Sequence, residues 1–239
     1  MTNRRTLLAS LFSFPLFAAD FWQSKKSSEW SDKELSKMMK DSPWSRQAVV
    51  SMGQGGGGGR SGGGSGEGGG GGRGGGGGKG GGGSKGGGGE GGGGGMPTIG
   101  LQIRWSSAKP VKLAMARMKF GAEADTKPEV KEMVDRAEKD YLITIDGIPA
   151  MMARQGPEKL IVALKKGSFI HCPGKDDLAP SDAQVGQGEK GIVALVSFPR
   201  KDSYSLDDKE VEFSMKMGNI SAKRKFKLKE MVFEGKLEL

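Results

Sequence analysis

The chain has 239 residues, 44 of which are glycine, and it carries a formal net charge of +9 with a single cysteine and a single histidine. The lone cysteine excludes an intrachain disulfide, and one cysteine with one histidine cannot fill the four positions of a structural zinc site. Most of the glycines lie within residues 53–95, so the part able to bury a core has the size of one ordinary domain. The modest positive charge is not in itself the signature of a nucleic-acid-binding protein, and we expect no nucleic-acid partner.

Residues 1–19 have the pattern of a signal peptide. Arg4 and Arg5 form a charged start, and residues 7–18 form an apolar stretch that ends next to Ala19. This stretch is short for a bilayer span, so we expect cleavage, with an uncleaved membrane anchor as the alternative. The paired arginines fit either a secretory or a twin-arginine route. The expected location is the periplasm or cell envelope of a bacterium.

Residues 20–52 are predicted to hold one short amphipathic helix, at about residues 31–41. Ser31 followed by Glu34 forms a capping box, and Pro43 follows the predicted helix end. A helix this short is marginal alone and needs a surface for its apolar side chains. These candidate partner-binding side chains are Trp30, Leu35, Met38, Met39 and Trp44. Another protein or the chain's own domain can supply that surface, and the sequence leaves both open.

Residues 53–95 are predicted to be a disordered glycine-rich linker, because glycine loses more backbone entropy on ordering than any other residue. A flexible chain of this length spans on average about 35 Å. We therefore expect it to tether the N-terminal segment, with a short strand at 48–50, to a globular domain at 96–239. The tract has two arginines and no aromatic residue, so it does not resemble an arginine-glycine RNA-binding segment.

The domain is predicted to begin with a strand at 98–105, where apolar and polar residues alternate. A helix follows, capped by Ser106-Ser107 with Pro110 in its first turn, and a second helix covers 128–140. A strand at 141–145 is expected to end in a turn at Asp146-Gly147. Further strands are predicted at 160–164, 168–171 and 192–198, the last buried on both faces, with a polar loop over 173–191.

The C-terminal part has the clearest pattern. Apolar and polar residues alternate over 211–217, 220–228 and 231–239, which predicts a three-stranded antiparallel meander with one solvent-facing side. Arg224 is the one polar residue on the apolar side. We therefore predict an α+β fold with an antiparallel sheet, and an all-β sandwich as the alternative if the two helices are strands.

Several stretches of the sequence resemble a group of uncharacterised exported bacterial proteins. They are the segment from Trp30-Ser31-Asp32-x-Glu34 to Asp41-Ser42-Pro43-Trp44, the glycine tract, the stretch Arg104-Trp105-x-Ser107-Ala108-x-Pro110-Val111 and the C-terminal residues 208–239. The resemblance covers both ends of the chain and implies export. It implies no activity and no catalytic residues.

Candidate chemical sites are few. His171 and Cys172 are neighbours on a predicted strand and point to opposite faces, so they are badly placed to act as a catalytic pair. The sequence has no phosphate-binding loop, dinucleotide fingerprint or nucleophile elbow. A basic strand is the candidate polyanion-binding site, through Lys223, Arg224, Lys225, Lys227 and Lys229. The alternative for this strand is the ordinary charged outer side of a sheet.

The sequence therefore favours a non-catalytic, exported protein-interaction module whose N-terminal helix contacts an unknown partner. A binder of polyanions or anionic surfaces is the second hypothesis, and an enzyme is the third. No cofactor and no metal are expected. Contact with a membrane is expected only through an uncleaved signal peptide, and the oligomeric state is open.

Overall fold

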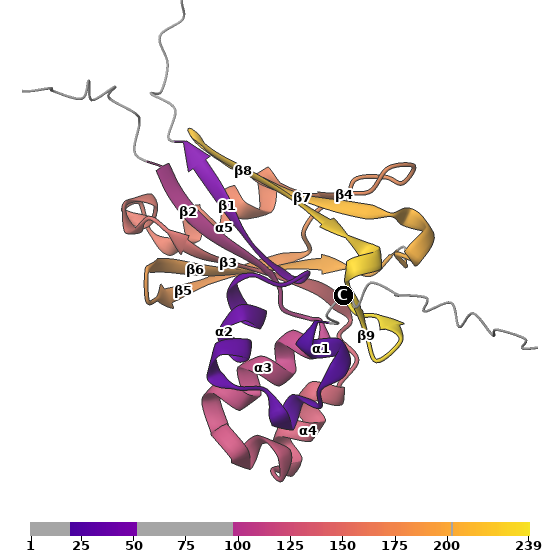
Figure 1. Ribbon diagram of the computed structural model, residues 1–239. Helices are drawn as coiled ribbons and strands as arrows, with labels where there is room; N and C mark the ends of the chain where they lie inside the picture. Colours follow the sequence, from indigo (N-terminus) through magenta and orange to yellow (C-terminus); the bar gives the residue numbers. More distant parts are fainter. Residues whose placement is uncertain (1–19, 52–97, 202) are drawn as a thin grey trace, which may run out of the picture.

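The computed structural model describes residues 20–51, 98–201 and 203–239, which form two antiparallel sheets and a group of helices around a shared core. Figure 1 shows the sheets stacked, with helices α1 to α4 gathered on one side of them. The α+β prediction is confirmed. The predicted signal peptide and the glycine tract lie outside the described residues.

The larger sheet has five strands in the order β1-β2-β3-β6-β5, and every neighbouring pair is antiparallel. Its strands are β1 (Ser45–Ser51), β2 (Thr98–Trp105), β3 (Asp140–Ile148), β5 (Asp182–Gly188) and β6 (Gly191–Pro199). The expected turn at Asp146-Gly147 is wrong, because β3 continues through a bulge there to Ile148. Gly147 has φ +93°, a conformation that favours glycine at this bulge.

The smaller sheet has three strands in the order β4-β7-β8, namely β4 (Ser168–His171), β7 (Glu210–Met217) and β8 (Ile220–Lys227). The predicted hairpin of β7 and β8 is confirmed, but the predicted third strand of the meander, at 231–239, is wrong. The chain end forms its own small hairpin of β9 (Val232–Phe233) and β10 (Lys236–Leu237), and β4 takes the third place. Leu239 is buried, as its pattern indicated.

The two sheets pack their apolar faces against each other. Trp105 of β2 lies edge-on to Phe226 of β8 at 5.6 Å between ring centroids, and Phe198 of β6 lies edge-on to Phe213 of β7 at 6.2 Å. Such edge-on pairs add to the free energy gained by burying aromatic area. Helix α5 (Pro157–Gly167) packs against both β5 and β7. The strand expected at 160–164 is therefore wrong: Leu160 and Leu164, four residues apart, form the buried face of this helix.

The remaining α-helices are α1 (Phe21–Ser24), α2 (Asp32–Lys40), α3 (Lys109–Phe120) and α4 (Pro128–Asp135). The short 3-10 helices are η1 (Ser27–Glu29), η2 (Gly121–Asp125), η3 (Ala150–Ala153), η4 (Leu206–Asp208) and η5 (Leu228–Glu230). Helix α2 has the predicted capping box, with the Ser31 and Glu34 side chains each accepting from the other's backbone N–H. Helix α4 ends earlier than predicted. Ser107 does not cap α3, because its hydroxyl accepts from the backbone N–H of Leu142 instead.

The segment before the glycine tract is part of the main core. Trp44 is fully buried, and its Nε1 donates to the Glu238 carbonyl oxygen at 2.8 Å. Trp22 lies edge-on to Trp44 at 5.9 Å, and Trp30 lies edge-on to Phe233 at 6.2 Å. The chain's own domain therefore supplies the surface that the N-terminal helix needs.

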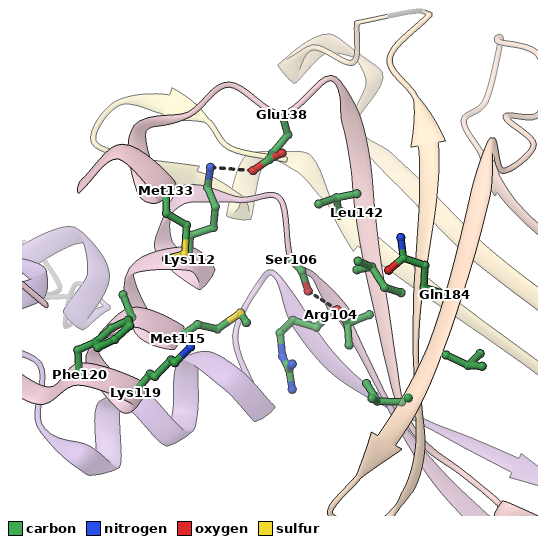
Figure 2. Close-up of a pocket in the computed structure, with 16 residues that line it drawn as sticks. Arg104, Ser106, Lys112, Met115, Lys119, Phe120, Met133, Glu138, Leu142 and Gln184 are labelled. Carbon is green, nitrogen blue, oxygen red and sulfur yellow. Dashed lines mark hydrogen bonds and ion pairs between the residues drawn. The ribbon is translucent and has the colours of Figure 1, made fainter. Parts of the chain in front are cut away.

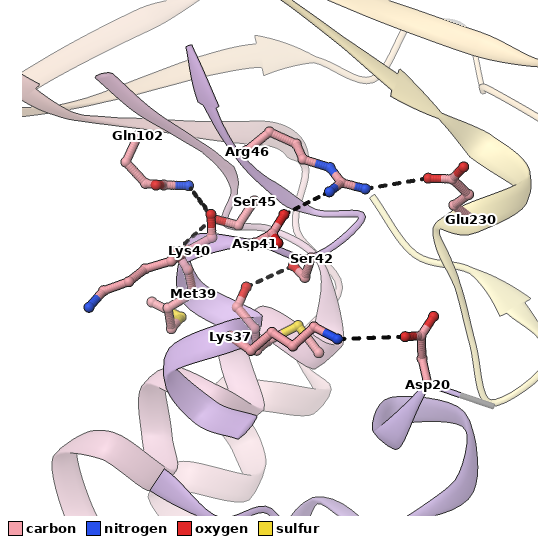
Figure 3. A network of polar contacts seen from close by, with 11 residues as sticks. Asp20, Lys37, Met39, Lys40, Asp41, Ser42, Ser45, Arg46, Gln102 and Glu230 are labelled. Atoms are coloured by element: carbon pink, nitrogen blue, oxygen red, sulfur yellow. Dashed lines mark hydrogen bonds and ion pairs between the residues drawn. The ribbon is translucent and has the colours of Figure 1, made fainter. Parts of the chain in front are cut away.

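Polar contacts at the end of α2 fix it to both the larger sheet and the chain's C-terminal part (Figure 3). The Gln102 Nε2 donates to the Lys40 carbonyl oxygen at 2.9 Å and to Ser45 Oγ at 2.8 Å. Arg46 lies between Asp41, at 2.8 Å, and Glu230, at 3.5 Å. These contacts connect the end of α2 to residues that lie far from it in the sequence.

The described residues on either side of the glycine tract are neighbours. Strand β1 pairs with β2 from Ser45↔Arg104 to Ser51↔Thr98, so residues 52–97 connect the two strands of one hairpin. The predicted strand at 48–50 is confirmed and is longer than expected. Both flanking segments belong to the same core, so the tract joins two paired strands of one folded unit. Its predicted disorder lies outside the described residues.

Candidate functional site

An apolar groove of about 690 Å³ lies between α3 and the outer face of the larger sheet (Figure 2). Its walls come from strands β2, β3, β5 and β6 on one side and from helices α3 and α4 on the other. The lining residues are Arg104, Ser106, Lys112, Met115, Ala116, Lys119, Phe120, Met133, Glu138, Leu142, Thr144, Gln184, Val185, Gly186, Val193 and Leu195. This size and this mainly apolar lining are typical of small-molecule pockets.

The sheet wall of the groove arises from the alternation of side chains along β3 and β6. Residues with even numbers on β6, such as Val196, face the smaller sheet and are fully buried. Val193 and Leu195 point to the opposite side and are only half-buried, as is Leu142 on β3. Strand β6 is central, but the prediction that both its faces are buried is wrong.

The helix wall is built from flexible apolar side chains. Met115 on α3 is 45% exposed and Met133 on α4 is 37% exposed, and both border the groove beside Phe120. Methionine adapts its shape to irregular apolar surfaces, which suits a binding wall. Lys119 and Lys127 lie over the Phe120 ring at 5.1 and 5.0 Å from its centroid. These cations hold the ring at the rim of the groove.

Several polar groups of the groove already form hydrogen bonds or ion pairs within the chain. Lys112 Nζ donates to the Arg136 carbonyl oxygen at 2.8 Å and lies 3.5 Å from Glu138. The hydroxyls of Ser106 and Thr144 are hydrogen-bonded at 2.5 Å. Two cationic side chains at the groove, Arg104 and Lys119, form no ion pair with any described residue. The groove thus combines apolar walls with a positive rim.

Arg104 holds a special position, since it reaches the outer face of the sheet from β2. Across the strands it pairs with Thr144, which in turn pairs with Leu195 on the floor of the groove. Its Nε donates to the Met39 carbonyl oxygen at 3.2 Å. Partial burial lowers the pKa of Arg104 from its ordinary value, an effect opposed by the charge of nearby Asp146. A desolvated guanidinium interacts more strongly with a bound anion than one in water does.

The predicted partner-binding residues do not form a free surface. All five are buried within the chain's own core, so this prediction is corrected in favour of the own-domain alternative: Trp30, Leu35, Met38, Met39 and Trp44. They stabilise the fold and are not available to a partner in this conformation.

The basic strand does not form a single positive face either. Lys223, Lys225 and Lys227 face solvent and form ion pairs with Glu212, Glu210 and Glu230, at 3.4, 2.5 and 3.1 Å respectively. Arg224 faces the opposite side of β8, and Lys229 lies beyond the strand in η5. The lysines therefore match the alternative of an ordinary charged sheet face.

His171 and Cys172 are separated as their strand position predicts. His171 is exposed and its Nδ1 lies 2.7 Å from Asp177, whereas Cys172 is fully buried. Burial raises the pKa of the Cys172 thiol, which disfavours the thiolate. Within residues 20–51, 98–201 and 203–239, no group of three or more His, Cys, Asp or Glu side chains is arranged to hold a metal ion.

Sequence reasoning missed the groove, although part of its signal was visible. The run 192–198 is apolar at both odd and even positions, which we took as burial on both faces. An apolar outer face without a cover gives the same pattern. Met115 and Met133 lie on α3 and α4, and only the three-dimensional packing of these helices leaves them exposed.

Over the described part of the chain, no helix has the length and apolar character needed to cross a membrane. Neither the sequence nor the fold has a match among protein-family models, curated proteins or solved structures.

Proposed function

We propose that the protein is an exported, non-catalytic binding protein that holds the apolar body of a small amphipathic molecule in the groove beside α3. The observation that carries the proposal is the half-buried apolar patch at Leu142, Val193 and Leu195, on the side of the sheet opposite to its buried core face. An apolar patch left open beside flexible methionines and a positive rim is a typical binding surface. The export part rests on the sequence pattern of residues 1–19.

The size of the groove favours a small molecule over a helix of a partner protein. Two turns of an α-helix with side chains fill roughly 850 Å³, taking a diameter of about 10 Å and a pitch of about 5.4 Å. The groove offers about 690 Å³, so such a helix would lie partly outside it. A single apolar chain or a small ring system fits inside and contacts both walls.

The non-catalytic part is supported by the chemistry at the groove. Its acidic side chain, Glu138, is engaged by Lys112 and Arg136, and its hydroxyls at Ser106 and Thr144 bond to each other. The histidine and the cysteine lie elsewhere, on and just after β4, and do not line the groove. A general base or nucleophile needs a free, activated group at the site.

A neutral fluorescent probe, N-phenyl-1-naphthylamine, tests the proposal, because its emission rises in apolar surroundings. We expect saturable binding by the full chain and at least about tenfold weaker binding by Met115→Lys, which places a charge on the helix wall. Met118→Lys is the matched control, since Met118 is 59% exposed on the same helix and does not line the groove. Absence of saturable binding, or equal loss in both variants, would overturn the proposal.

A further inference from the structure

A second, polar cavity of about 530 Å³ adjoins the groove at the β1 edge of the larger sheet. Arg104 lines both cavities, so they meet at this side chain. The remaining lining residues of the polar cavity are Lys40, Asp41, Arg46, Gln47, Gly100, Gln102, Asp146, Glu189, Lys190 and Arg224. A molecule lying along the outer face of the sheet would therefore pass from apolar to charged surroundings within one site.

Two side chains that line the polar cavity each carry a buried atom with no hydrogen-bond partner among the described residues. These atoms are Nε of Arg224, a donor, and Oδ1 of Asp146, an acceptor. Buried polar atoms are nearly always paired, and leaving one unpaired costs about 1–3 kcal/mol. Arg224 is also the polar residue on the otherwise apolar side of β8, where it faces this cavity. Both side chains line the cavity, and within the described part of the chain neither buried atom finds its partner.

The charge in the cavity is positive. Arg46 is engaged by Asp41 and Glu230, as Figure 3 shows. Four other cationic side chains line it and form no ion pair with a described residue: Lys40, Arg104, Lys190 and Arg224. Asp146 and Glu189 are the carboxylates that face them. Water molecules at the two unpaired atoms would carry no charge and would therefore not offset this excess of cationic side chains.

We propose that the polar cavity binds the head group of the molecule whose apolar body occupies the groove, and that this head group carries a phosphate and a hydroxyl. The phosphate accepts hydrogen bonds from Arg224 and Arg104, and the hydroxyl donates to Asp146. Guanidinium groups recognise phosphate oxygens through charge-assisted hydrogen bonds. The ligand class is a free single-chain phospholipid with an anionic, hydroxylated head. This inference rests on the proposed function of the groove.

Calorimetric titration with three lipids of one chain length, each kept monomeric, tests the head-group site. Lysophosphatidylglycerol has the anionic, hydroxylated head, lysophosphatidylcholine has no net charge, and monoacylglycerol has no phosphate. We expect lysophosphatidylglycerol to bind at least about tenfold more tightly than the other two. Monoacylglycerol lacks the phosphate that accepts from the arginines, and in lysophosphatidylcholine a choline cation offsets the phosphate charge and replaces the hydroxylated head. In Arg224→Gln this preference should fall by about tenfold, while Lys223→Gln, one residue away on the solvent side, should keep it.

Two further measurements distinguish a failure of the head-group site from a failure of the groove. Lys40→Gln removes one positive charge from the cavity at an exposed side chain and should also weaken the preference for lysophosphatidylglycerol. It therefore tests the head-group site even where Arg224→Gln fails to fold. Equal affinities for the three lipids, an unchanged preference in the folded cavity variants, or no binding of lysophosphatidylglycerol would overturn the head-group site. Binding of the neutral probe, with its loss in Met115→Lys, is independent of charge and reports on the groove alone.

Discussion

Both faces of the five-stranded sheet carry apolar residues, but these residues differ in how far they are buried. On the inner face Ile103, Ile143 and Val196 are fully buried under the smaller sheet. On the outer face Leu142, Val193 and Leu195 stay half-exposed, because the helices pack beside them and leave a groove. The difference teaches that apolar residues in one strand can serve two purposes. The inner set stabilises the fold, and the outer set is the one that we propose contacts a ligand.

The largest expected effect is on the inner side, where Trp44→Ala should lower the free energy of unfolding by about 3–5 kcal/mol. Trp44 is fully buried, and its loss also leaves the Glu238 carbonyl oxygen without its indole donor. Urea unfolding followed by circular dichroism measures the change. Met118→Ala, at an exposed position, is the control and should differ from the wild type by less than about 0.5 kcal/mol. A loss below about 1 kcal/mol in Trp44→Ala would mean that the N-terminal segment is not part of the core.

The second effect concerns the hairpin between β1 and β2. Replacing residues 52–97 with a two-residue Asn-Gly turn should raise the free energy of unfolding by about 2 kcal/mol, because closing a shorter loop costs less conformational entropy. The direction follows from the pairing of Ser51 with Thr98, the described residues that flank the replaced segment. Chemical denaturation of both chains measures the gain. If residues 52–97 instead separated two independent units, the deletion would force these units together and destabilise the protein. A less stable or unfolded product would therefore contradict the hairpin.

A matched pair on β6 compares the two faces directly. Val196→Thr places a hydroxyl in the fully buried inner face and should cost about 1–3 kcal/mol, whereas Val193→Thr on the half-exposed face should cost less than about 0.5 kcal/mol. The shifts of the urea unfolding midpoints give both changes in free energy, provided that the slope of unfolding free energy against urea concentration is the same in all proteins. Equal costs would show that the outer face is covered as tightly as the inner one.

The smallest effect is a pH dependence at the surface of α2. Hydrogen bonds from Lys25, at 2.6 Å, and from the Ser31 backbone lower the pKa of Glu34 from 4.5 to about 2. A lowered folded-state pKa gives stability that is complete above about pH 4.5 and is lost as the pH falls towards 2. In Glu34→Gln this part of the acid-induced loss should be absent, as measured by thermal unfolding at a series of pH values. Identical pH profiles in the two proteins would contradict the assignment.

Much of the fold was predictable because it depends on local pattern. The strand at 98–105, the capping box at Ser31 and the hairpin at Gly218 follow from alternation, capping and turn chemistry, and the structure has them. Leu160 to Leu164 was misjudged as a strand because five residues fit both periods. The β5 strand was missed because its sequence is polar and glycine-rich, and its pairing partner β6 determines its conformation.

The candidate site was less predictable than the fold. Whether Trp30 and Trp44 face a partner or their own domain depends on long-range packing, which the local pattern does not contain. The unusual inward position of Arg224 was visible in the sequence, but its meaning required the cavity that β1 and β2 complete. The groove itself arises between elements that are distant in the chain, so no single stretch predicts it.

The claim that the outer face is a binding surface is tested most directly by nuclear magnetic resonance of protein labelled with carbon-13 at the methionine methyl groups. Methionines lie on both sides of the comparison: Met115 and Met133 border the groove, and Met38 and Met215 are buried in the core. On titration with N-phenyl-1-naphthylamine, we predict saturable shifts of the Met115 and Met133 signals and unchanged Met38 and Met215 signals. Shifts confined to the core methionines, or no shift of Met115 and Met133 at saturating probe, would contradict the account.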